Sequence, residues 1–296
     1  MAVYQRPLSL TFKQFFESER SGSILLVICT LLALSLANSP FGASFLGFWQ
    51  SYVAGLSIEH WVNDALMAVF FLLVGLELKR EMISGELSDI QNALLLIFAA
   101  FGGVAVPAGI HFALNAGTST QPGIGIPMAT DIVFALAALS MLGKSVPASL
   151  KVFLATLAIV DDLAAIIVIA VLYTSQLSVL YLLGAVAVFS GLIALNKVMK
   201  VKALLPYLIG GAIMWFFMLQ SGVHATLAGV LLAFAIPASS LQDDYHSPSQ
   251  ILEHELHKPV ALFILPIFAL ANAGAMIGAS WADSLTTNNS LGIIGG

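Results

Sequence analysis

Nine long apolar runs constrain the fold of this chain more than any other feature of its sequence. They occupy residues 22–37, 60–78, 92–114, 122–142, 148–174, 178–196, 203–219, 221–236 and 259–277. A run of about 20 apolar residues has the length that an α-helix needs to cross a bilayer. A membrane β-barrel would instead show segments of about ten residues with alternating polarity. The runs therefore predict an all-α polytopic membrane protein, with about nine transmembrane helices in a single transmembrane domain over residues 1–296.

The composition points to the same class. The chain is 59% hydrophobic and 9% charged, with a mean hydropathy of +0.97, whereas soluble domains carry about 25% charged residues. Its single cysteine, Cys29, excludes an intrachain disulfide and a cysteine-cluster metal site. An apolar face at helical spacing precedes the first run. It is compatible with a short interfacial helix or with an unstructured tail.

The eleven basic residues test the number and direction of the runs. They are Arg6, Lys13, Arg20, Lys79, Arg80, Lys144, Lys151, Lys197, Lys200, Lys202 and Lys258. With nine spans, all of them fall on one side of the membrane. Cytoplasmic loops are enriched in Lys and Arg, so we expect a cytoplasmic N-terminus in a multi-pass protein. The chain would then end outside, on the apolar stretch Leu291–Gly296, which predicts the first residues of a further span.

Two adjacent aspartates, Asp161 and Asp162, lie in the middle of the fifth run. A charged side chain near the centre of a bilayer costs about 2.5–3.5 kcal/mol on insertion scales. Burial and a neighbouring carboxylate both disfavour the charged form. Such a pair is tolerated when it is protonated, paired with a cation or open to a water-filled cavity. We therefore expect an ion or proton exchange site here, the alternative being an aspartate buried by hydrogen bonds alone.

The fourth run is predicted to be a discontinuous helix. It contains two prolines and two glycines before Asp131, and the helix is expected to restart near Pro127. Asp131 would then lie in the first helical turn, where the positive helix end stabilises a carboxylate. Broken helices near the midplane are typical of transporters. With Thr130, Asp161 and Asp162, Asp131 makes an oxygen-only set that suits a small hard cation. A capping role for Asp131 is the alternative.

Charged and titratable residues flank the cytoplasmic ends of the second and ninth runs. They are Glu77, Lys79, Arg80, Glu81, Glu253, His254, Glu255 and His257. Histidines titrate near neutrality, so this group is a candidate for sensing cytoplasmic pH, although charges outside spans are usually only solvated. The histidine spacing matches no known metal pattern. His224, beside Ser221, is by itself more typical of a hydrogen-bonded core histidine.

Two further features of the sequence allow more than one interpretation. The connection from Gly42 to Glu59 is aromatic and polar, which is compatible with an external hairpin at the membrane interface. Asp64, early in the second run, would serve a hydration path from outside or would be an ordinary carboxylate near the interface.

At these residues the sequence resembles the NhaA-type sodium/proton antiporters. The resemblance extends over nearly all of the chain. The stretches that carry it are Gly75–Glu81, Gly125–Ile132, Leu157–Leu163, Ser221–Thr226 and Leu265–Gly274.

The resemblance implies a role for each group of residues. Asp161 and Asp162 would form the exchange site, with Asp162 the more direct ion ligand, and Thr130 and Asp131 would support it at the helix break. A pH-response region would contain Glu77, Arg80, Glu81, Glu253, His254 and His257, together with His224. The implied substrates are sodium, or lithium, and protons, and no cofactor is expected. The implied location is the bacterial inner membrane, with lipid around the protein, a second copy of the chain as a candidate partner and no nucleic acid.

The sequence also departs from the family pattern. The family has twelve spans in an inverted-repeat fold, and this sequence stops where the tenth begins. The fold would be incomplete, lacking the second broken helix and the tenth-span lysine near the aspartate pair.

The predicted activity is pH-regulated, electrogenic exchange of cytoplasmic sodium for external protons by alternating access, which is secondary active transport and not enzyme catalysis. The alternatives are an inactive antiporter fragment, a passive ion channel and an intramembrane aspartyl protease using Asp131 and Asp162. The last would leave the adjacent carboxylate, Asp161, without a role.

Overall fold

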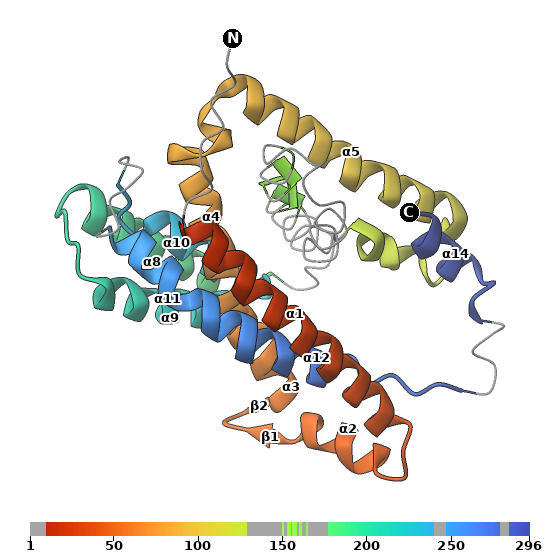
Figure 1. Cartoon of the computed structure of the whole chain (residues 1–296). Coiled ribbons are helices and arrows are strands. Elements are labelled where there is room, and N and C mark those ends of the chain that lie inside the picture. The colour runs from red at the N-terminus through yellow and green to blue at the C-terminus, as the bar shows by residue number, and fades with distance from the viewer. Residues whose placement is uncertain are drawn as a thin grey trace.

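A computed structural model describes residues 10–128, 150, 153–154, 156–158, 160–161, 164, 177–239, 247–278 and 284–296. Its longer helices are α1 (Leu10–Ala37), α2 (Gly42–Gln50), α4 (Met67–Ser84), α5 (Ile90–Asn115), α8 (Val179–Lys197), α9 (Leu204–Ser221), α10 (Leu227–Ala235), α11 (Pro248–Pro259), α12 (Leu265–Asn272) and α14 (Asn288–Gly295). Shorter elements are the strands β1 (Tyr52–Val53) and β2 (Leu56–Ser57), helix α3 (Ile58–His60), the π-helices η1 (Trp61–Leu66) and η5 (Val260–Ile264), and the 3-10 helices η2 (Glu86–Ser88) and η3 (Gln121–Met128). Figure 1 shows their arrangement.

The predicted all-α membrane fold is confirmed. Within the described ranges, five helical segments are long and apolar enough to cross a membrane: Ile58–Ser84, Ile90–Asn115, Val179–Lys197, Leu204–Ser221 and Pro248–Asn272. A sixth is present if Gly22–Ala37 and Gly42–Gln50, bent by 115°, count as one span. The predicted fourth and fifth spans fall largely outside the described residues. The total of nine therefore stays a prediction.

The helical segment of the predicted ninth span begins earlier in the structure than the sequence predicted. The run 259–277 suggested a helix from residue 259, but α11, η5 and α12 form one continuous helical segment from Pro248 to Asn272. The Ser247 side chain accepts a hydrogen bond from the backbone N–H of Gln250, and Pro248 occupies the first turn. Both features favour a helix start. The charged stretch before residue 259 is therefore helix and not loop.

The predicted eighth span is shorter than expected. Helix α9 ends where Gly222 adopts a left-handed conformation with φ of 82°, and α10 has nine residues. At 1.5 Å per residue, α10 is about 14 Å long, which is less than half the thickness of a bilayer core.

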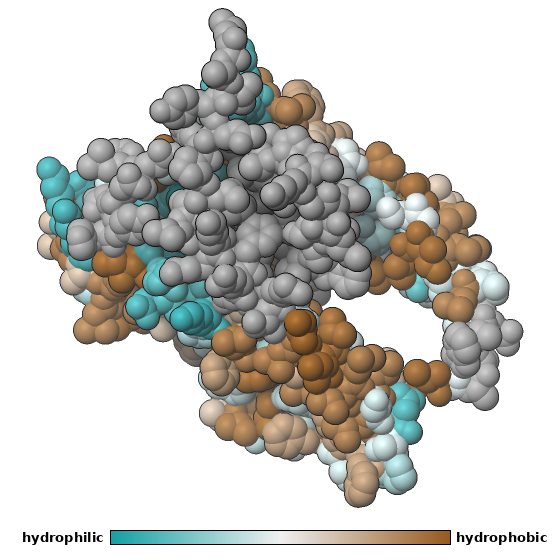
Figure 2. All heavy atoms as spheres, viewed as in Figure 1, coloured by the Kyte–Doolittle hydropathy of each residue, from teal (hydrophilic) through white to brown (hydrophobic). Residues whose placement is uncertain are grey.

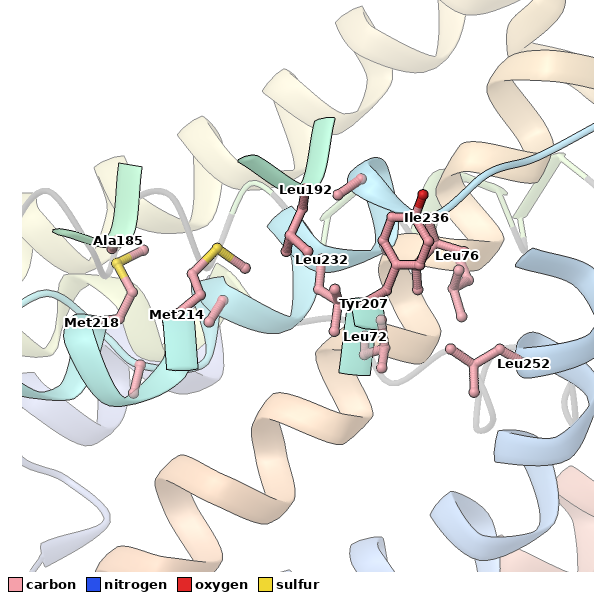
Figure 3. Packing of buried hydrophobic residues seen from close by; sticks show 14 residues of the cluster. Leu72, Leu76, Ala185, Leu192, Tyr207, Met214, Met218, Leu232, Ile236 and Leu252 are labelled. Atoms are coloured by element: carbon pink, nitrogen blue, oxygen red, sulfur yellow. The ribbon is translucent and has the colours of Figure 1, made fainter. Parts of the chain in front are cut away.

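Helix α10 lies at the centre of the main apolar core, with α4, α8 and α9 around it. Leu76 from α4, Tyr207 and Met214 from α9 and Leu232 from α10 are all buried in this cluster (Figure 3). The helices approach closely because small residues lie where they cross. A Cβ atom added to Gly229 would collide with the backbone carbonyl of Ala68 and lie 2.8 Å from the backbone N of Leu72. Small residues at crossings are typical of helix packing in membranes.

Helix α1 packs in parallel against η5 and α12 (Figure 1). Gly22 abuts Ala261 near the start of the contact. At the far end, the Asn38 side chain donates to Ala275 O at 2.8 Å and accepts from the backbone N–H of Ile277 at 2.7 Å. Helix α1 is continuous from Leu10, so the segment before the first run is helical from that residue and not an unstructured tail.

The lower part of the molecule in Figure 2 carries a large apolar surface, where α1 and α2 lie. Exposed apolar side chains on these helices include Ile24, Leu31 and Phe48. A surface of this kind is expected where helices face lipid, because lipid tails solvate apolar side chains.

The connection after α2 forms the expected hairpin. Strands β1 and β2 pair in antiparallel fashion, with Tyr52 opposite Ser57. The two turn residues, Ala54 and Gly55, have φ of 51° and 89°. Two positive φ values in succession are typical of the tightest hairpin turns, and glycine adopts them at little cost.

Gly229→Ala should destabilise the core, because the added methyl group meets the α4 backbone, which cannot move aside as a side chain can. Overpacking of this kind costs about 1–3 kcal/mol. We expect a clear fall in the thermal unfolding temperature of the detergent-solubilised protein. Gly109→Ala in α5, where an added Cβ has nothing within 4 Å, is the matched control. Equal stability of the two variants would contradict this packing.

Candidate functional site

Asp161 is a buried carboxylate beside the α5 backbone. Asp161 is only 4% exposed to solvent. Oδ2 lies 3.7 Å from the position that a Cβ atom would occupy on Gly103. Because Gly103 has no side chain, nothing from that residue separates the carboxylate from the helix backbone. The expected burial of Asp161 is confirmed.

The other three residues of the predicted exchange site, Thr130, Asp131 and Asp162, lie outside the described residues. The chain leading to Thr130 is described as far as Met128. Between α5 and that point it forms the 3-10 helix η3, which runs through Pro127. An irregular, proline-containing segment before Asp131 agrees with the predicted helix break, but Pro127 lies within this 3-10 helix and does not begin an α-helix there.

Helices α4 and α11 bring acidic, basic and imidazole groups together. Arg80 donates from Nη1 to Oε1 of Glu253 and from Nη2 to Oε1 of Glu81, the latter at 3.2 Å. His257 Nε2 lies 3.4 Å from Glu77 Oε1. Glu77 and Glu253 are both buried. We call Glu77, Arg80, Glu81, Glu253 and His257 the α4–α11 cluster.

Helical spacing and apolar packing explain why the charged side chains of α4 and α11 lie close together. Glu253 and His257 are four residues apart on α11, so they share one helix face. Their neighbour Leu252 and the α4 residue Leu76 belong to the same core cluster (Figure 3). The packing of these leucines therefore holds the two charged faces against each other.

Two of the predicted pH-response residues lie outside the α4–α11 cluster. His254 is exposed, although it is adjacent to Glu253 in the sequence. His224 is half-buried in the turn between α9 and α10, near enough to Asp64 to interact with its charge. Asp64 and Glu77 are thirteen residues apart in one helical segment, or about 20 Å at 1.5 Å per residue. His224 therefore belongs to the opposite end of that segment.

That opposite end is built around the π-helix η1. Trp215 of α9 donates from Nε1 to the backbone oxygen of Asp64 at 3.1 Å, and its ring stacks on Trp61. Asn63 and Asn272 exchange side-chain hydrogen bonds at 3.1 and 2.7 Å. Single-turn π-helices occur frequently at functional sites.

Sequence reasoning missed the role of Lys79. Its ammonium group donates to three backbone oxygens at the end of α10: Ala233 O and Phe234 O at 3.1 Å, and Ile236 O. Asn196 donates to Ala235 O at 2.8 Å. The last carbonyls of a helix lack partners within the helix, and a cation satisfies them well. A basic residue directly after an apolar run was the available signal, but its partner could not be read from the sequence.

These contacts place Lys79, Arg80 and Lys197 at one end of the described helices. The ends of α4, α8 and α10 meet there through Lys79 and Asn196. Arg80 joins the first half of α11 to them, and Lys197 is near enough to Lys79 to interact with its charge.

Comparison with known proteins matches this chain to a single family along almost its whole length. The model of the family described as Na⁺/H⁺ antiporter 1 matches residues 13–296. A protein of Dechloromonas aromatica named Na(+)/H(+) antiporter NhaA is 66% identical over 296 residues, which is 100% of this chain and 76% of that protein. A protein of the same name from Flavobacterium psychrophilum is 55% identical over 282 residues, covering 95% of this chain and 73% of that protein.

The Arg80–Glu253 pair can be tested by a double-mutant cycle. Arg80→Gln leaves the Glu253 carboxylate buried without its cation, so we expect a loss of at least about 2 kcal/mol in unfolding free energy. Combining it with Glu253→Gln should recover part of that loss. Thermal unfolding in detergent would measure the cycle, with the exposed Glu255→Gln as the control. Strictly additive losses would mean that the two groups do not interact.

Proposed function

This chain belongs to the family described as Na⁺/H⁺ antiporter 1, and from that premise we propose that it exchanges sodium ions for protons across a membrane. Its helices are those of a multi-pass membrane protein. The observation that carries the proposal is the 66% identity, over the full chain, to a protein named as such an antiporter. Within the described structure, the buried carboxylate of Asp161 adds a group able to hold a proton or a cation.

In the proposed cycle, protons and sodium compete for Asp161 and Asp162. A carboxylate in a low-dielectric site needs either a proton or a cation to offset its charge. Sodium binding from the cytoplasm would release protons, and protons from outside would release sodium. If two protons move for each sodium ion, the exchange carries net charge and the membrane potential can drive sodium out. We assign the more direct contact with the ion to Asp162.

Thr130 and Asp131 are proposed to support this site from the break in the preceding helix. A hydroxyl and a carboxylate at a helix start can complete an oxygen-only ligand set for a small cation. The same set would accept lithium. No cofactor is required, because the transported ions supply all the chemistry.

The α4–α11 cluster is proposed to make exchange depend on cytoplasmic pH. It contains an imidazole and three carboxylates around one guanidinium, and it joins two helices. Protonation of His257 would change the charge balance between α4 and α11. His254 is proposed to act from the exposed face of α11. His224 is proposed to act near the start of the helical segment Ile58–Ser84, at the end opposite Glu77.

The proposed location is the bacterial inner membrane, with the N-terminus in the cytoplasm, following the positive-inside rule. Lipid would surround the helices, and two copies of the chain would form a homodimer. No binding of nucleic acid is proposed. Catalysis is likewise no part of the proposed function, which is transport alone.

Asp162→Asn tests the exchange site. The amide cannot exchange a proton for a cation, so we expect sodium-dependent exchange to fall at least tenfold. Acid-interior vesicles containing the chain would be loaded with a pH-sensitive dye, and alkalinisation would be followed after sodium addition. Glu255→Gln should exchange like the unmodified chain. Intact exchange by Asp162→Asn would refute the assigned role.

Gly103→Leu tests the position of Asp161. A leucine side chain at residue 103 would occupy the space beside the Asp161 carboxylate, so exchange should fall strongly. Gly102→Leu is the matched control, because an added Cβ there meets nothing within 4 Å. The same vesicle assay would compare the two variants, and equal activity would show that the carboxylate needs no free space at Gly103.

A further inference from the structure

The α4–α11 cluster contains three side chains with the types and spacing of a metal site. The oxygen and nitrogen atoms that Glu77, Glu253 and His257 could offer to an ion all lie within 4.8 Å of one another. We propose that these three residues bind a transition-metal dication of the Zn²⁺ type. This site is separate from the proposed sodium site at Asp161 and Asp162, and the inference goes beyond the proposed exchange activity.

The distances support a shared ion. In a tetrahedral zinc site, bonds of about 2.0–2.2 Å place neighbouring ligand atoms roughly 3.4 Å apart. His257 Nε2 and Glu77 Oε1 are already 3.4 Å apart. That separation is long for a hydrogen bond and suits two ligands of one metal. The ligand oxygen of Glu253 lies within 4.8 Å of both atoms, so the third group is close to the same point.

The helices provide a rigid frame for these ligands. Glu253 and His257 are four residues apart on α11, the spacing at which two side chains on one helix face bind zinc in helical metal sites. Glu77 comes from α4, and Leu256 of α11 packs into both core clusters that border the two helices. Three protein ligands leave a fourth position for water, as in open zinc sites.

An independent observation also points to a ligand. Glu253 is 4% exposed, and Arg80 bonds only its Oε1. Its Oε2 is buried and has no hydrogen-bond partner among the residues that the structure describes. A buried carboxylate oxygen without a partner is costly. A metal ion bound at Oε2 would remove that cost and leave the Arg80 contact in place.

The charge and the ligand types select the kind of ion. With its carboxylates ionised, the cluster holds three negative charges and the one positive charge of Arg80. A dication balances the remainder. Sodium, magnesium and calcium prefer oxygen ligands alone, whereas a set with an imidazole favours zinc, nickel or cobalt. A bound metal would also tie α4 to α11.

Zinc binding can be measured on the full chain, purified in detergent and freed of metal. Isothermal titration should give one Zn²⁺ per chain, and binding should raise the unfolding temperature. Glu77→Gln and His257→Ala should each weaken binding at least tenfold. His254→Ala is the matched control, because this histidine lies on the same helix but is exposed, and it should bind like the unmodified chain.

A spectroscopic measurement keeps the test independent of the variants' folding. Co²⁺ bound to the unmodified chain should show the visible absorption of a tetrahedral site and should be displaced by one equivalent of Zn²⁺. No binding to the unmodified chain would overturn the inference, as would binding lost in His254→Ala instead of His257→Ala. Neither measurement needs transport, so sodium exchange without zinc binding would refute only the metal site. Zinc binding without exchange would refute only the proposed function.

Discussion

The absence of water from the hydrocarbon core is the constraint on which this structure depends. Every buried backbone group that ends a helix must find a partner in the protein. Helix α10 ends inside the bundle after about 14 Å, and Lys79 of α4 and Asn196 of α8 satisfy its last carbonyls. These bonds, with the close crossing at Gly229, fix α10 against α4. The core described by Tyr207, Met214 and Leu232 is built around that contact.

The same constraint groups the charged residues. Arg80 is held by Glu253 and Glu81, and Glu77 lies against His257, so the charges of α4 and α11 are offset within the α4–α11 cluster. Asp161 is buried beside Gly103 of α5. In the proposed function its carboxylate exchanges one ion for another, whereas the charge balance of the α4–α11 cluster joins two helices.

Asp161 and the α4–α11 cluster are the two described regions to which the proposed function assigns roles. Family membership indicates antiport, and in the proposed function the buried carboxylate of Asp161 would hold either ion. The α4–α11 cluster would adjust the packing of two helices when its charge changes, whether by protonation or by a bound dication.

The sequence by itself determined the class of fold, the approximate positions of the spans that the structure describes and the burial of Asp161, because each depends on hydropathy along a short stretch of chain. It also placed Glu253 and His257 on one helix face, provided that their stretch is helical. It did not predict that α11 starts at Pro248. Ser247 stands in a stretch rich in charged residues, so it was not recognised as the residue that caps the helix. The role of Lys79 came only from the tertiary structure. The contact between Arg80 and Glu253 joins residues 173 positions apart. Such contacts depend on which helix faces pack together, and hydropathy does not encode that information.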